Sequence, residues 1–216
     1  MDYRAILKRV GFAWVTFGLL DIVLMIYYIM NGQSYSSSFN IFAVIIGIFL
    51  IRGSLGATTL VTWLTAFMLT GCIGVILIFP FLQPMGLLLT QAKLNPVSSI
   101  IGWLMGIFVL AMLGWTWKQM RSHPVLEARK ASGRPTTTPK IAIGLGIVLV
   151  AFLGVMLNSL LNGAIGTKAI ALARQKLGPN YKYAAQSIRV SGRYRSGIVV
   201  AYNDKEIKYV PVHWNE

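Results

Sequence analysis

The chain of 216 residues has little of the chemistry that most metal and redox sites need. It contains one cysteine, Cys72, and two histidines, His123 and His213. A single cysteine excludes an intrachain disulfide and a cysteine-based metal site. His213 is close in sequence to Asp204 and Glu206, but the spacing matches no known set of ligands. We therefore expect no bound metal and no cofactor.

Catalytic motifs are also lacking. The sequence has no Walker, Rossmann or HExxH pattern, and it has no nucleophile elbow and no Ser-x-x-Lys arrangement. Each of these motifs places a nucleophile, a base or a phosphate cradle at a fixed spacing. The sequence therefore predicts a protein that is not an enzyme.

Acidic residues are scarce, with six Asp and Glu against 20 Lys and Arg and a formal net charge of +14. In a soluble protein this excess would favour a nucleic acid partner. Here the cations lie at the ends of apolar runs and in the C-terminal tail, where positive-inside topology and anionic lipid account for them. We expect anionic membrane lipids as partners and no nucleic acid.

Apolar residues are abundant, since 56% of the chain is hydrophobic and its mean hydropathy is +0.65. One soluble domain of this length needs far less apolar surface. The first apolar run, 11–30, is about 20 residues long, the length of a full membrane span, and no small-residue cleavage site follows it. The sequence predicts a mostly α, polytopic membrane protein whose first helix is retained.

The order of apolar and basic segments predicts five transmembrane helices in residues 1–163 and an α+β domain in residues 164–216. The spans are predicted at 11–30, 36–51, 57–79, 97–117 and 141–161. The loop 118–140 carries six Lys and Arg against Glu127, and short basic loops stay in the cytoplasm. The N-terminus is then cytoplasmic and the C-terminal domain lies on the other side.

Two segments differ from ordinary spans. The second is short, because its continuous apolar part, 39–51, would rise only about 20 Å against a hydrocarbon thickness of about 30 Å. Residues 85–94 follow Pro84, have mixed polarity and carry one charge, Lys93. This pattern predicts an interfacial helix on the outer side. Pro80 is expected to close the third span.

The tail has the pattern of a small α+β domain. Apolar residues at helical spacing over 169–177 stop at Gly178, which predicts a helix. Three β-rich runs separated by turn-forming pairs follow at 181–191, 193–203 and 205–214. One helix over a three-stranded antiparallel meander is the economical fold, with Pro211 on an edge strand. About fifty residues is marginal for a separate core, so we expect the sheet to lean on the membrane part or on a partner.

Three stretches resemble an uncharacterised family of small bacterial inner-membrane proteins that carries no assigned activity. They are SYSSSFNIFAVIIGIFLIRGSL (Ser34 to Leu55), LNPVSSI (Leu94 to Ile100) and AYNDKEIKYVPVHW (Ala201 to Trp214). The resemblance implies a bacterial inner-membrane location and adds no catalytic residue. With the predicted five-span topology, the C-terminal domain is then expected in the periplasm. The tail is also similar in its order of elements to the α+β domains of membrane-anchored cytochrome-oxidase assembly factors and to cystatin-like modules, a similarity of fold alone.

Asp21 lies near the middle of the first span, where an ionisable group is costly and suggests a functional site. If the second segment begins at the outer interface near Phe39, Arg52 reaches a similar depth, and an Asp21–Arg52 pair is predicted. A small transporter or an ion- or proton-conducting protein built on Asp21 is the alternative function. The structural alternative is that Asp21 is neutral or hydrogen-bonded to Thr65, Thr70 or backbone and only sets the helix register.

The tail carries nine Lys and Arg against three acids, a net charge of +6, with tyrosines interleaved among the cations. Such a surface suits anionic phospholipid headgroups or an acidic partner, and plain solvated strand faces are the alternative. The candidates for partner or lipid binding are Arg189, Arg193, Tyr194, Arg195 and Tyr202.

Gly102 and Gly106 form a small-xxx-small motif that predicts a close helix contact, either within the chain or across a homo-oligomer. Ordinary intrachain packing is the favoured interpretation. The leading functional hypothesis is a non-enzymatic accessory, assembly or regulatory factor whose outer domain contacts a membrane or periplasmic protein or lipid.

Overall fold

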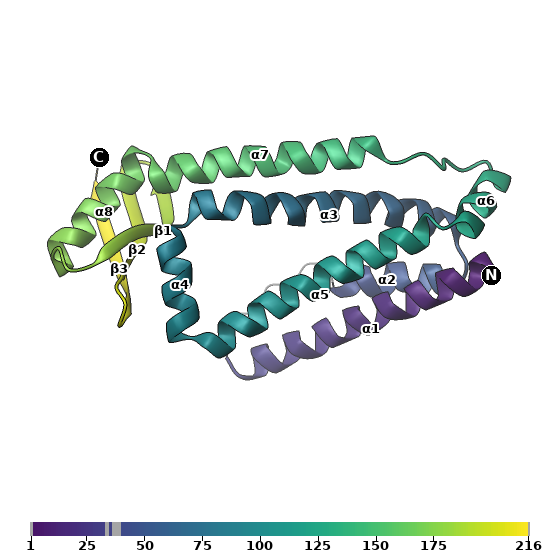
Figure 1. The fold of residues 1–216 in the computed structure, drawn as a ribbon, viewed down its shortest axis with the longest axis horizontal. Helices are drawn as coiled ribbons and strands as arrows, with labels where there is room; N and C mark the ends of the chain where they lie inside the picture. The colour runs from purple at the N-terminus through teal and green to yellow at the C-terminus, as the bar shows by residue number, and fades with distance from the viewer. Residues whose placement is uncertain (1, 33–34, 36–39, 216) are drawn as a thin grey trace. The chain divides into compact units, whose positions relative to one another are not determined.

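The computed structural model describes residues 2–32, 35 and 40–215. These residues form eight helices and one three-stranded sheet, in the order labelled in Figure 1. The mostly helical class with a small antiparallel sheet is confirmed. Contacts divide the chain into two compact units, Met1–Leu69 with Leu110–Gly144, and Thr70–Val109 with Leu145–Glu216. The domain boundary predicted at residue 163 stays a prediction.

The first two helices belong to the first unit. Helix α1 (Tyr3–Met30) begins before the predicted start because the Asp2 carboxylate accepts a hydrogen bond from the Arg4 backbone N–H at 3.2 Å. Helix α2 (Asn40–Ile51) ends where predicted, while residues 36–39 of the predicted span lie outside the described residues. With 12 residues, α2 is about 18 Å long, shorter than a membrane span.

Glycines bring α1 and α2 into direct backbone contact. A Cβ added at Gly47 would lie 2.7 Å from the carbonyl oxygen of Gly11 and 2.6 Å from Cγ2 of Val15. A Cβ added at Gly11 would lie 2.6 Å from the carbonyl oxygen of Gly47. Since no side chain fits at either position, this contact fixes the register of α2 on α1.

Four helical stretches of the described chain are long and apolar enough to cross a membrane by length and composition. They are α1, α3 (Leu55–Leu82), α5 (Pro96–Met120) and the run Lys140–Leu177, which comprises α7 (Lys140–Asn162) and α8 (Ala164–Leu177). The five-span topology stays a prediction, since α2 is the shorter apolar helix. Helix α3 also continues through Pro80, which corrects its predicted end. Pro80 lies in the last turn, where its missing N–H removes one hydrogen bond without breaking the helix.

Helix α6 (His123–Ala131) lies inside the stretch predicted as a basic loop, 118–140, and corrects that prediction. Ser122 occupies the N-cap position and a proline lies in the first turn, both ordinary signals of a helix start. Val125 is fully buried and anchors the helix. Sequence reasoning missed α6 because the cations of this stretch were attributed to topology alone.

The second unit contains the sheet. Helix α4 (Met85–Leu94) has its predicted bounds, and α8 ends at Gly178, whose φ of 80° favours glycine. Strands β1 (Lys182–Ser191), β2 (Tyr194–Tyr202) and β3 (Ile207–Asn215) pair antiparallel in the order β1-β2-β3. The predicted meander is confirmed, and Pro211 lies in the edge strand β3.

Both faces of the sheet are covered along the second half of β2. Val199 and Ala201 pack on α8, whereas Val200 and Tyr202 point to the opposite face and pack on Leu87 of α4. Successive side chains of a strand point to opposite faces, so four consecutive buried residues require two covering layers. The sheet therefore leans on a helix outside the tail, as expected for so small a domain.

Helices α3 and α7 also approach closely within the second unit. A Cβ at Gly74 of α3 would lie 2.9 Å from Cγ1 of Val150, and a Cβ at Gly154 of α7 would lie 2.9 Å from Cδ1 of Ile78. The two helices thus interlock through one glycine on each and one branched side chain on the other, and Figure 1 shows them side by side.

We predict that Gly47→Ala destabilises the protein, because the new methyl group meets backbone atoms of α1 that cannot move independently. The expected loss is about 1–3 kcal/mol, measured as a lower thermal unfolding midpoint in mild detergent. Gly71→Ala on α3 is the matched control, since a Cβ there has nothing within 4 Å and alanine favours a helix. Equal stability of the two variants would contradict the α1–α2 contact.

Candidate functional site

Asp21 on α1 is half-buried and accepts a hydrogen bond from the hydroxyl of Tyr35. The ring of Tyr35 stacks on that of Tyr28, with centroids 5.6 Å apart. The donor is not Thr65, whose hydroxyl has no hydrogen-bond partner. Asp21 is therefore hydrogen-bonded to a donor that the sequence did not suggest, and this bond ties Tyr35 back onto α1. The role of Asp21 in setting the helix register stays a prediction.

The structure does not bring Asp21 and Arg52 together. A Cβ on Gly53, directly after Arg52, would lie 3.8 Å from the side chain of Arg4. The end of α2 therefore lies beside the first turn of α1, roughly 25 Å along the helix from Asp21 at the ordinary rise per residue. The predicted pair is wrong because it placed α2 by membrane depth, whereas the glycine contact sets its register.

The five tail residues selected from the sequence do not share one surface. Strand alternation places Arg189 and Tyr194 on the face that α4 partly covers, and Arg195 on the face that carries α8. Arg193 is exposed in the turn between β1 and β2. Tyr202 is only 5% exposed and packs against α4. Burial removes Tyr202 from the predicted partner-binding surface.

Part of the α4-side face of the sheet is open. The register places Arg189, Tyr194, Ile198, Pro211 and His213 there, all of them exposed, and we call these five residues the open sheet face. Ile198 is 41% exposed and Tyr194 is 48% exposed, so apolar surface faces solvent. On this side of the three described strands there is no Asp or Glu. The open sheet face is thus apolar, aromatic and basic.

A contact between Tyr194 and His213 orders one end of the open sheet face. The hydroxyl of Tyr194 lies 3.1 Å from Nδ1 of His213, and the two rings stack with centroids 6.2 Å apart. His213 is exposed on strand β3. The contact holds a flat aromatic surface on the same face of the sheet as Arg189.

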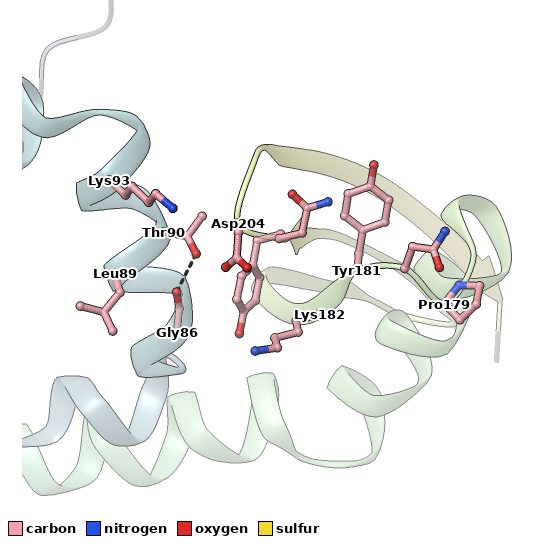
Figure 2. Close-up of a pocket in the computed structure, with 11 residues that line it drawn as sticks. Gly86, Leu89, Thr90, Lys93, Pro179, Tyr181, Lys182 and Asp204 are labelled. Carbon is pink, nitrogen blue, oxygen red and sulfur yellow. Dashed lines mark hydrogen bonds between the residues drawn. The ribbon is translucent and has the colours of Figure 1, made fainter.

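A cavity of about 460 Å³ lies between α4 and the turns that flank β1 and β2. Figure 2 shows Lys93 reaching from α4 towards the strands and Asp204 reaching from the β2–β3 turn towards α4. Lys182 lines the cavity as well, and Asn180 adds an amide. Two ammonium groups and one carboxylate can hold a small charged group by charge-assisted hydrogen bonds.

Sequence reasoning did not find this cavity, because its lining comes from segments more than 80 residues apart in the chain. The one available signal was Lys93, the single charge in the predicted interfacial helix. Tyr202 forms part of the wall, and burial raises the pKa of its hydroxyl. That hydroxyl therefore stays protonated at neutral pH.

A small ionic network closes the β2–β3 turn. The ammonium of Lys208 donates to Glu206 at 2.9 Å and to the hydroxyl of Tyr181 at 2.8 Å, and Tyr181 donates to Glu206. Hydrogen bonds from Lys208 and Tyr181 lower the pKa of Glu206, and the bond to Glu206 raises the pKa of Lys208. The network links the start of β1 to the start of β3.

Gly102 and Gly106 do not pack against another described part of the second unit. A Cβ at either position would have nothing within 4 Å. Within the second unit the structure therefore shows no close helix contact at these glycines, and intrachain packing stays a prediction. A contact across a homo-oligomer stays a prediction.

Comparison with protein-family models, curated proteins and solved structures gives no match for this chain. The two resemblances drawn from the sequence therefore stay predictions.

We predict that Glu206→Gln removes an acid-sensitive step in the stability of the β2–β3 turn. The pKa of Glu206 is lower in the folded chain than in the unfolded chain, where it is about 4.3. The ionised carboxylate therefore stabilises the folded turn above the unfolded pKa, and this stabilisation is lost as the pH falls through the folded pKa. Hydrogen exchange of residues 203–208 should speed up in the wild type between about pH 6 and pH 3, after correction with an unfolded peptide. The variant should already exchange faster at the higher pH and lose no further protection; a wild-type acid response in the variant would contradict the assignment.

Proposed function

We propose that the protein is a non-enzymatic, multi-pass protein of the bacterial inner membrane that acts as an accessory or assembly factor. Its C-terminal α+β domain lies in the periplasm and binds an acidic surface of another envelope protein. The observation that carries the proposal is the open sheet face, where apolar, aromatic and basic side chains are exposed together and the described strands carry no Asp or Glu.

The composition of the open sheet face favours a protein partner over a lipid surface. Tyrosine and arginine are enriched at the energetically important centres of protein interfaces. Recognition of anionic lipid usually takes a cluster of four to eight Lys and Arg, whereas the open sheet face has one, Arg189. An exposed aromatic pair beside a single guanidinium fits an apolar surface that carries a carboxylate.

The arrangement in the membrane follows from the apolar helices and the basic stretch 118–140. Four helical stretches have the length and composition of spans, and short basic loops remain in the cytoplasm. The α+β domain begins with α8, at the end of the last of these apolar stretches, and its sheet follows that stretch. We place the N-terminus and α6 in the cytoplasm and the sheet outside.

Cysteine labelling tests this arrangement, because the chain has a single native cysteine, Cys72, that can be replaced by serine. In that background, Ser191→Cys in the sheet should react with a membrane-impermeant maleimide in cells whose outer membrane is permeabilised. Ala131→Cys at the end of α6 should react only after lysis. Both positions are exposed, so burial does not explain a difference. The reverse labelling pattern would overturn the orientation.

Site-specific photo-crosslinking tests the partner. A photoreactive amino acid at Tyr194 or Ile198 should yield one discrete protein adduct in cells, because both side chains lie on the open sheet face. Lys205, exposed in the β2–β3 turn, is the control position and should not yield it. Arg189→Glu should abolish the adduct by reversing the charge opposite the acidic partner.

The purified adduct partner should then bind the full-length protein in detergent with an affinity that falls as salt is raised. The proposal is contradicted if Lys205 and Tyr194 yield the same adduct in equal amounts, or if the adducts contain phospholipid alone. It is also contradicted if the adduct still forms in the Arg189→Glu variant.

A further inference from the structure

Arg129 is a buried cation with incomplete hydrogen bonding. It lies in the last turn of α6 and is only 2% exposed. Its Nη1 donates to the hydroxyl of Thr62 on α3 at 3.2 Å, and its Nη2 donates to the carbonyl of Pro135. Its Nε is buried without a hydrogen-bond partner. A buried guanidinium with an unused donor is costly unless another group satisfies it.

Two more guanidinium groups accompany Arg129. Arg121, at the end of α5, is half-buried, packs its guanidinium over the ring of Trp117 at 5.2 Å, and has a buried Nη1 without a hydrogen-bond partner. Arg134 is exposed, and its Nη1 lies 3.2 Å from a Cβ built on Gly56, in the first turn of α3. We call Arg121, Arg129 and Arg134 the arginine centre. Burial and the charges of Arg121 and Arg134 lower the pKa of Arg129.

No carboxylate of the first unit balances these charges. The three acids among its described residues have other roles: Asp2 caps α1, Asp21 accepts from Tyr35, and Glu127 pairs with His123 at 3.4 Å. The C-terminus of α6 supplies a partial negative charge next to Arg129, but the N-terminus of α3 beside Arg134 supplies a partial positive one. The helix ends therefore leave three cations without a counter-charge.

We propose that the arginine centre binds a phosphate group, either in a phospholipid headgroup or in a soluble phosphate compound. Arginine is the preferred residue for such a group, because its planar fork donates two parallel hydrogen bonds to phosphate oxygens. The unpartnered Nε of Arg129 and Nη1 of Arg121 are donors that no other described group uses. Exposure falls from Arg134 through Arg121 to Arg129, so an anion that approaches from the surface would meet Arg134 first.

The site lies within the stretch between the long apolar helices α5 and α7 (Figure 1). That stretch would meet the headgroup layer if these helices cross the bilayer, which makes a phospholipid one natural source. A soluble phosphate compound offers the same oxygens. The inference is independent of the open sheet face, because all its residues belong to the first unit, and failure of either proposal leaves the other unaffected.

The test uses purified full-length protein in detergent, with two probes. Inorganic phosphate, compared with chloride at equal ionic strength, should raise the thermal unfolding midpoint in a saturable way if soluble phosphate binds. Phosphatidylglycerol supplied in mixed micelles should remain bound in native mass spectrometry if a headgroup binds, and inorganic phosphate should then compete with it. A response to either probe supports the site and identifies the source.

Arg134→Gln is the variant of choice, because Arg134 is exposed and its loss does not empty the protein interior. The variant should bind the probe that responds in the wild type about tenfold more weakly, which is the loss of affinity expected when a charge-assisted hydrogen bond is removed. Lys130→Gln removes the same charge from an exposed position of α6 and should leave binding unchanged. The proposal is overturned if the wild type responds to neither probe. It is also overturned if Arg134→Gln binds the probe as tightly as the wild type, or if Lys130→Gln loses as much affinity as Arg134→Gln.

Discussion

Burial of β2 on both faces is the constraint on which the C-terminal domain depends. The run Val199 to Tyr202 is buried throughout, and a strand can bury consecutive residues only when a layer covers each face. Helix α8 supplies one layer from the tail itself. The other comes from α4, which precedes the tail by nearly 70 residues. The sheet thus cannot complete its core from its own segment of chain, in line with the small core that so few residues provide.

The same constraint produces both candidate binding features of the domain, the open sheet face and the cavity beside α4. Helix α4 has ten residues and covers only the part of the sheet near Val200 and Tyr202. Past its reach the strands continue, and their side chains form the open sheet face. Where α4 meets the turns around β1 and β2, the imperfect fit leaves the cavity lined by Lys93, Lys182 and Asp204. Surface and cavity are both consequences of covering a longer sheet with a short helix.

Local patterns predicted the elements of this domain but not its layers. Alternation and turn residues indicated three strands, and Gly178 indicated the end of α8, because these signals act over a few residues. Alternation also implies that Tyr202 shares a face with Tyr194, but it does not say where that face is covered. The mixed polarity of α4 was attributed to a membrane interface, although one apolar side chain, Leu87, packs on the sheet. The sequence did not show that α4, which is distant in the chain, packs on one face of the sheet. This packing decides which of the predicted site residues are exposed.

In the first unit, sequence reasoning predicted a wrong residue pair, because helix packing and not the number of residues from the membrane interface decides which residues of α1 and α2 meet. Counting residues from the presumed interfaces put Asp21 and Arg52 at one depth, whereas the approach of Gly11 and Gly47 sets a different register. Glycine spacing alone did not reveal this contact, because Gly11 and Gly47 belong to no Gly-xxx-Gly motif, whereas Gly102 and Gly106 in the second unit form one and show no close contact within that unit.

The basic stretch 118–140 shows how charge that sets topology and charge that serves a site can be separated. A cation that only holds a loop on one side of a membrane does so equally well in water, and Lys118, Lys130 and Lys140 are exposed. Topology gives no reason to bury Arg129 beside other guanidiniums, since desolvation makes its charge more costly. Burial, which the sequence does not show, is therefore the property that distinguishes Arg129 from the lysines around it. A cation that is kept buried and unbalanced needs a counter-charge, and the described acids of its unit are engaged elsewhere.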